Sequence, residues 1–314
     1  MRITLIVAVV LAANYVVMDL IGAVLMFVKV IYRNPRQARI REYSKNDDDE
    51  KKRMYEEGLR WSKQYSEITN QLHVVSDGLN LYGEYVDLGY DKCAIILQGR
   101  TESLVYCYYY ADIYARCGYN ILVVDIRAHG LSDGKYHTSG IRESDDLVVW
   151  IDCIRNVYGI SNFAIHGICV GGATAIYALF KLRKKGVDVI RRIATDGLFT
   201  TNYELFRRNM REYKQPAFPA LQICFLMARI MAGVDLFRET PIRYVSAVDI
   251  PMLFIWSRVD KYCVPQKGEE LFELCGSPTK QIHFFPKGAH SHVRYNQPDE
   301  YDTVVAKFLS NEDH

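Results

Sequence analysis

The sequence predicts an α/β domain whose central sheet is mostly parallel and carries helices on both faces. From about residue 71 onward, short apolar runs alternate with longer stretches of helical periodicity. Buried strands that are separated by helices imply a mostly parallel sheet that is covered on both faces. The 314 residues suffice for one large domain of this kind and an appendage. The net charge of +2 gives no indication of nucleic acid as a partner.

The elements of this domain can be placed in order along the chain. The Asp77-Gly78 pair between two short runs predicts a hairpin, which opens the domain. The expected strands are residues 71–76, 79–86, 93–98, 120–125, 163–168, 189–196, 252–256 and 281–285. The expected helices are residues 103–117, 141–157, 173–181, 266–275 and 299–309. Residues 197–245 break the alternation and predict an insertion above the sheet that forms a lid.

The N-terminal segment, residues 3–31, is nearly all apolar and exceeds the roughly 20 residues that a helix needs to cross a bilayer. A signal peptide is the alternative, but the run is too long and no small-residue cleavage site follows it. Asp19 would cost about 3 kcal/mol at a helix centre, which the apolar run offsets. We therefore expect a transmembrane anchor at 1–31, a linker with a helix at 32–70, and the α/β domain at 71–314.

Charges around this span predict its orientation. Only Arg2 and the α-amino group precede the span, whereas several basic residues follow it: Lys29, Arg33, Arg36, Arg39 and Arg41. The positive-inside rule then places the domain in the cytoplasm. The 8 cysteines are scattered, with no C-x-x-C pair and no zinc-like Cys/His spacing. Free thiols of this kind favour a reducing compartment.

The strongest local signal lies at residues 161–175. An apolar strand there meets the run Gly-Ile-Cys-Val-Gly-Gly, whose reactive side chain is Cys169, and a helix follows. A strand that turns sharply into a helix, with small residues around one reactive side chain, is a nucleophile elbow, spelled here G-x-C-x-G in place of G-x-S-x-G. The alternative is that Cys169 is a small buried core residue. A dinucleotide-binding turn is disfavoured because the full G-x-G-x-x-G is absent.

A nucleophile at this position requires a base and an acid. His290 is the first candidate for the base because it lies in the loop after the last expected strand, and His292 is its rival. Asp260, which follows strand 252–256, is the candidate acid. Asp196, which ends the preceding strand, is the fallback.

The oxyanion of an acyl-transfer reaction needs two backbone N–H donors. The amide of Val170 directly follows the nucleophile, and the amide of Arg100 lies in the loop after strand 93–98. These two amides are the candidate oxyanion hole. No metal or organic cofactor is expected, and the expected partner is a small-molecule acyl substrate.

With these motifs, the chain resembles the α/β-hydrolase superfamily, and within it the membrane-anchored hydrolases related to the serine aminopeptidase and monoacylglycerol lipase group. The resemblance covers about residues 71–310. Its most specific part is residues 125–134, which match a D-x-R-G-H-G-x-S-x-G loop except at Ala128. Residues 76–81 resemble the family's opening hairpin, shortened by one residue. His290 is followed by Pro298 at the family's usual spacing of about eight residues, which favours it over His292.

The sequence departs from the family pattern at three places. Cys169 replaces the usual serine, and Gln98-Gly99 replaces the usual His-Gly of the oxyanion loop. The acid loop, from Asp260 to Pro265, has one residue more than the pattern D-x-x-V-P.

The resemblance implies a membrane-anchored hydrolase that cleaves a carboxylic ester, a thioester or a related acyl bond through a Cys-His-Asp triad and an acyl-enzyme. Peptidase activity is less favoured. The alternative is a weakly catalytic or inactive scaffold that binds a ligand or partner at the membrane. All three triad positions are retained, and this favours the enzyme.

Overall fold

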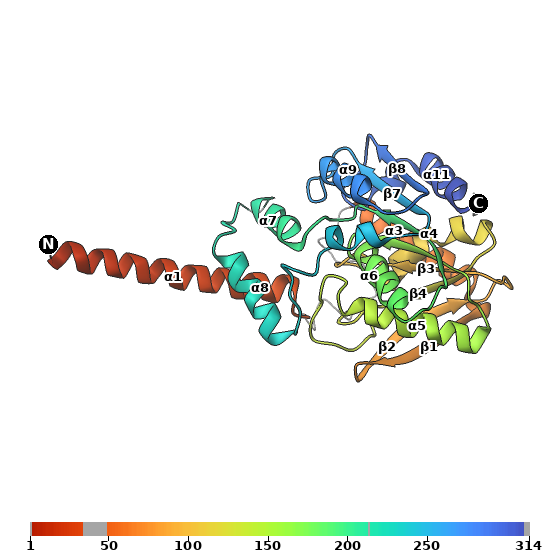
Figure 1. Cartoon of the computed structure of the whole chain (residues 1–314), viewed down its shortest axis with the longest axis horizontal. Helices are drawn as coiled ribbons and strands as arrows, with labels where there is room; N and C mark the ends of the chain where they lie inside the picture. The colour runs from red at the N-terminus through yellow and green to blue at the C-terminus, as the bar shows by residue number, and fades with distance from the viewer. Residues whose placement is uncertain (1, 34–48, 213, 311–314) are drawn as a thin grey trace.

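The structure is a computed structural model that describes residues 2–33, 49–212 and 214–310 (Figure 1). Its centre is an eight-stranded sheet of order β1-β2-β4-β3-β5-β6-β7-β8. The strands are β1 (Thr69–Ser76), β2 (Leu79–Val86), β3 (Cys93–Leu97), β4 (Asn120–Val124), β5 (Phe163–Ile168), β6 (Ile190–Asp196), β7 (Met252–Ser257) and β8 (Lys280–Phe285). The β1–β2 and β2–β4 pairs are antiparallel and the others are parallel, which confirms the predicted mostly parallel sheet.

Helices cover both faces of this sheet. They are α3 (Asp49–Gln64), α4 (Leu104–Arg116), α5 (Glu143–Tyr158), α6 (Val170–Lys184), α9 (Pro265–Leu274), α10 (Val293–Asn296) and α11 (Pro298–Ser310). The connection through α4 runs from β3 to β4, whereas α5 and α6 lead across the sheet in the opposite direction. Right-handed crossovers therefore place α4 on one face and α5 with α6 on the other. The short α10 was not predicted from the sequence.

The strand ends bring distant loops together. The pairing Ile168↔Asp196 and the pairing Asp196↔Ile255 place the ends of β5, β6 and β7 at nearly one level. Ser257 pairs with Phe285, which does the same for β8. The loops after these strands carry the candidate nucleophile, acid and base, so the fold gathers them at the carboxyl edge of the sheet.

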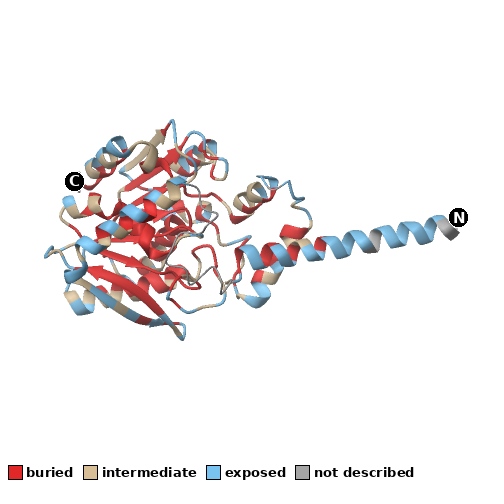
Figure 2. Ribbon diagram, turned by 180° about the vertical axis from the view of Figure 1, so that it is seen from behind, coloured by how far each residue is buried: buried red, intermediate tan, exposed pale blue. Residues whose placement is uncertain are grey.

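The N-terminal helix α1 (Arg2–Val30) projects away from the domain (Figure 1). Among the described residues, Thr4–Val30 is the one helix long and apolar enough to cross a membrane. Its outer part is exposed, whereas its inner end is partly buried (Figure 2). The buried apolar side chains of this end are Ala23, Met26, Phe27 and Val30. They form a second core with α8 (Ala220–Met231), a contact that the sequence did not predict.

The chain after α1 is held against the domain. Arg33 donates hydrogen bonds to the carbonyl oxygens of Ser132 (2.6 Å) and Gly130 (3.0 Å). The amide of His137 donates to the carbonyl oxygen of Ile31 (2.7 Å). The end of α1 is thus fixed to the loop that carries the most specific family motif.

The predicted insertion contains the α-helices α7 (Asn202–Glu212) and α8. Figure 1 shows α8 across the inner end of α1, and α7 near it. Glu212 at the end of α7 lies 3.9 Å from the ammonium group of Lys261, next to the candidate acid Asp260. The insertion therefore connects the end of α1 with the loop that carries the acid.

Candidate active site

The turn from β5 into α6 has the geometry of a nucleophile elbow. Cys169 has a φ of +49°, an angle that is strained for a residue with a side chain. A Cβ at Gly167 would lie 2.3 Å from the backbone of Gly171, and a Cβ at Gly171 would lie 2.4 Å from the carbonyl oxygen of Leu97. Both positions therefore require glycine, and the close approach brings the end of β3 beside the turn.

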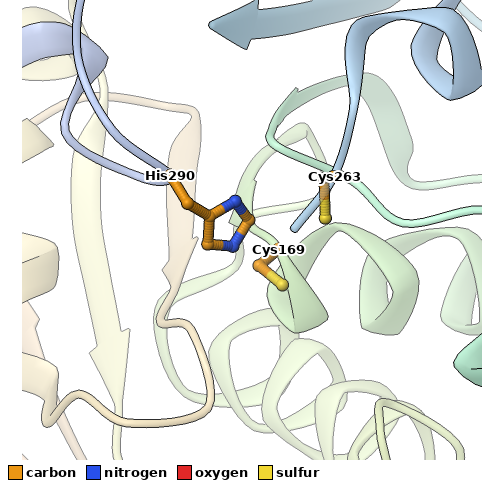
Figure 3. Close-up of side chains that lie close together, drawn as sticks. All are labelled: Cys169, Cys263 and His290. Carbon is orange, nitrogen blue, oxygen red and sulfur yellow. The ribbon is translucent and has the colours of Figure 1, made fainter. Parts of the chain in front are cut away.

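The predicted triad residues meet at this turn. His290 Nδ1 lies 2.7 Å from Asp260 Oδ2. The other oxygen, Asp260 Oδ1, accepts hydrogen bonds from the amides of Tyr262 (2.8 Å) and Cys263 (2.9 Å), which fix the carboxylate. Cys169 Sγ, Cys263 Sγ and a ring nitrogen of His290 all lie within 4.8 Å of one another (Figure 3). The three side chains come from three different loops.

The two rival residues are placed elsewhere. His292 Nδ1 lies 3.0 Å from the carboxylate of Glu50 on α3, so His292 pairs with that helix. Asp196 Oδ2 accepts a hydrogen bond from the Tyr301 hydroxyl (3.0 Å), and burial raises the pKa of Asp196 to about 7. The carbonyl oxygen of Asp196 accepts from the amide of Cys169 (2.8 Å), so Asp196 supports the elbow.

Electrostatics at the site favour a charged pair. A hydrogen bond from the Cys263 thiol lowers the pKa of Cys169, and the neighbouring imidazole of His290 lowers it further against the effect of burial. Burial opposes a charge on His290, but Asp260 and Cys169 together raise the pKa of His290 well above its ordinary value. A thiolate beside an imidazolium follows, and the thiolate is the nucleophilic form of cysteine.

The candidate oxyanion loop is braced from two sides. The amide of Gly99 donates to the Glu102 carboxylate (3.1 Å), and Gln98 Nε2 donates to the Glu102 carbonyl oxygen (2.7 Å). His129 Nε2 lies 2.5 Å from the carbonyl oxygen of Arg100. Val170 is the first residue of α6, whose leading amides have no partner within the helix. The loop that contains Gln98-Gly99 in place of His-Gly is therefore still braced beside the elbow.

Three contributors to the site were missed at the sequence level. Cys263 lies in the acid loop, and the extra residue of that loop was its signal. Gly197 follows β6 with a φ of +64°, and a Cβ there would lie 2.9 Å from Cε1 of His290. His129 was part of the matched motif, but only the structure shows that it holds the loop of Arg100. Among the described residues, Cys169, Cys263 and His290 form the one group able to hold a metal ion.

Comparisons with known proteins agree with this architecture. Residues 95–219 match the family described as alpha/beta hydrolase fold. The uncharacterized protein YqkD of Bacillus subtilis is 28% identical over 218 residues, which are 69% of this chain and 70% of that protein. The uncharacterized membrane protein YNL320W of Saccharomyces cerevisiae is 24% identical over 216 residues, which are 68% of this chain and 69% of that protein.

A solved structure shows the same fold. The Pyrococcus furiosus esterase Pf2001 superimposes with a TM-score of 0.65 at 23% identity, over 79% of this chain and 94% of that one. This likeness and the family match confirm the fold that was predicted from the sequence.

Proposed function

We propose that this chain, a member of the α/β-hydrolase superfamily, cleaves a carboxylic ester, a thioester or a related acyl bond. One observation carries the proposal. Cys169 occupies the elbow and faces His290, whose Nδ1 is held by Asp260 at 2.7 Å. This arrangement supports the roles of nucleophile, base and orienting acid that acyl transfer requires.

In the proposed reaction, the Cys169 thiolate attacks the substrate carbonyl carbon. The amides of Val170 and Arg100 stabilise the oxyanion that forms. His290 donates its Nε2 proton to the leaving alkoxide or thiolate as the carbon–heteroatom bond breaks, and an acyl-enzyme thioester remains. His290 then takes a proton from water, the resulting hydroxide attacks the thioester, and the carboxylic acid product leaves as the Cys169 thiolate is restored.

The apolar surface near the N-terminal helix supports an apolar acyl substrate at a membrane. We expect α1 to anchor the chain, and the helix packed on its inner end, α8, carries exposed apolar side chains. These are Leu226, Ile230 and Met231. The named membrane protein of yeast supports anchoring.

A cytoplasmic orientation of the domain remains a prediction. Arg33 donates hydrogen bonds to the carbonyl oxygens of Gly130 and Ser132. Its positive charge therefore has a structural role and is weaker support for the positive-inside rule. Lys29 remains as a basic residue at the end of the span. Arg36, Arg39 and Arg41 lie outside the described residues.

The test uses the full chain in detergent with a chelator, p-nitrophenyl esters of several chain lengths, and intact mass measurement. The native chain should turn over and carry an acyl adduct, and Cys169→Ala should lose both. Turnover by Cys169→Ala would contradict the proposed nucleophile. Turnover by Cys169→Ser alone would mean that the native thiol does not release these acyl groups.

The second candidate is a scaffold without hydrolytic activity. It is favoured by two departures from the family pattern, Cys169 in place of serine and Gln98-Gly99 in place of His-Gly. Failure of the native chain and of Cys169→Ser on every ester, with ligand binding retained, would support it.

A further inference from the structure

The site holds one thiol more than acyl transfer requires. Cys263 is 3% exposed, and its amide donates to Asp260 Oδ1 at 2.9 Å. The carboxylate that positions His290 therefore also fixes the backbone of Cys263. The second thiol is held at the site by the same group as the base.

The distances at this cluster match a metal site better than a disulfide. Cys169 Sγ, Cys263 Sγ and a ring nitrogen of His290 lie within 4.8 Å of one another (Figure 3). Tetrahedral zinc, with Zn–S of about 2.3 Å and Zn–N of about 2.0 Å, places neighbouring ligand atoms about 3.5–3.8 Å apart. Side-chain shifts on the order of 1 Å would reach that geometry. A disulfide needs the two sulfur atoms about 2.05 Å apart, a much larger approach.

We propose that Cys169, Cys263 and His290 bind a soft divalent metal ion, Zn²⁺ above all, and that the bound ion blocks hydrolysis. Two thiolates and one imidazole form a known zinc ligand set whose fourth position is open. His290 is prepared for this role because Asp260 holds Nδ1 at 2.7 Å and leaves Nε2 for the metal. A carboxylate behind the ligating imidazole is a regular feature of zinc sites.

Metal binding would inhibit because it uses the same atoms as the reaction. The ion displaces the proton of the Cys263 thiol and the Nε2 proton of His290, and it bonds to the sulfur of Cys169, which can then no longer attack a carbonyl. It also occupies the ring nitrogen of His290 that would exchange a proton with the substrate. The inhibition rests on the proposed function, whereas the metal binding does not.

The test is a titration of the reduced full chain in detergent with Co²⁺, followed by displacement with Zn²⁺. We expect one equivalent bound, with a thiolate-to-cobalt charge-transfer band of two-thiolate intensity. Cys263→Ala and Cys169→Ala should each keep about half of that intensity per bound ion. The affinity of each variant for Co²⁺ should fall by more than the roughly 10–100-fold that is typical when a residue hydrogen-bonded to a metal ligand is replaced. Cys153→Ser is the matched control, since Cys153 is a partly exposed thiol on α5.

The outcomes separate the two proposals. The metal site would be overturned if the native chain bound no equivalent of Co²⁺ or Zn²⁺, or if binding were lost in Cys153→Ser. Neither result would affect ester hydrolysis measured with a chelator. Metal binding that follows Cys169 and Cys263 in a chain without hydrolysis would overturn only the proposed function. Where both hold, saturating Zn²⁺ should abolish hydrolysis and a chelator should restore it. Activation by Zn²⁺ would overturn the inhibition.

Discussion

Replacing Asp260 with Asn should disable the base while preserving the shape of the acid. Asp260 Oδ1 accepts from the amides of Tyr262 and Cys263, at 2.8 and 2.9 Å. In Asp260→Asn, these two donors keep the carbonyl oxygen of the new side-chain amide in place and turn its NH₂ group toward His290 Nδ1. That nitrogen must then accept, so the ring proton moves to Nε2, where no lone pair remains for a proton from thiol or water.

The expected loss follows from the role of the base. A positioned general acid–base contributes about 10²- to 10⁴-fold, which corresponds to roughly 2.7–5.5 kcal/mol of transition-state stabilisation. We expect kcat/KM for a p-nitrophenyl ester to fall within that range. The same substitution removes the charge that raises the pKa of His290, so the thiolate of Cys169 should also become scarcer. Slower alkylation of Cys169 by iodoacetamide near neutral pH would report this directly.

Asp196→Asn provides the matched control. Burial raises the pKa of Asp196 to about 7, so an uncharged amide resembles the protonated form of this residue. Its Oδ2 accepts from Tyr301 rather than from His290, and an amide oxygen can accept in the same way. We expect Asp196→Asn to change kcat/KM by less than about tenfold. The reasoning is refuted if Asp260→Asn stays within tenfold of the native chain, or if Asp196→Asn loses as much.

Three further changes test other parts of the molecule. Gly197→Ala should lower kcat/KM by at least tenfold, because the new Cβ would lie 2.9 Å from the imidazole of the proposed base. Gly186→Ala is its control and should keep activity, because Gly186 also has a positive φ but a Cβ there would have no atom within 4 Å. Removing residues 1–31 should lower the melting temperature in detergent, because it exposes the buried side of α8, whereas removing residues 1–16 should not. Burial lowers the pKa of His166 to about 3, so the unfolded chain gains a proton first as the pH falls below about 6.5. The native chain should therefore lose stability relative to His166→Gln between about pH 6.5 and 3, by at most about 5 kcal/mol in denaturant melts; equal pH dependence in both would contradict a buried neutral imidazole.

The elbow could be read from the sequence because its causes are local. A glycine at position 167 and another at 171 are required by contacts within a few residues of Cys169 and by the neighbouring strand end. Buried strands can likewise be predicted from apolar runs, since the pattern of hydrophobic residues lies within each strand itself. The order of nucleophile, acid and base along the chain then implied the fold.

Contacts between distant segments could not be read in this way. His292 is excluded from the site by Glu50, which lies 242 residues away, and no local pattern near either residue announces that pair. Apart from Lys29, the inner end of α1 is apolar on all sides, so its sequence does not distinguish a lipid neighbour from the surface of α8. Only the packing of Phe27 and Val30 against that helix reveals the difference.

Two departures from the family pattern have a common explanation in the proposed metal site. The longer acid loop brings Cys263 beside position 169, and the cysteine at 169 supplies the second soft ligand. A serine at 169 would leave one thiol and one imidazole, a weak set for Zn²⁺. An ordinary cysteine hydrolase, in turn, would need no thiol at 263. Cys169→Ser should therefore lose metal affinity as strongly as Cys263→Ala, although serine is the usual nucleophile of the fold. If Cys169→Ser and the native chain bound the metal with equal affinity, the metal site would not explain both departures.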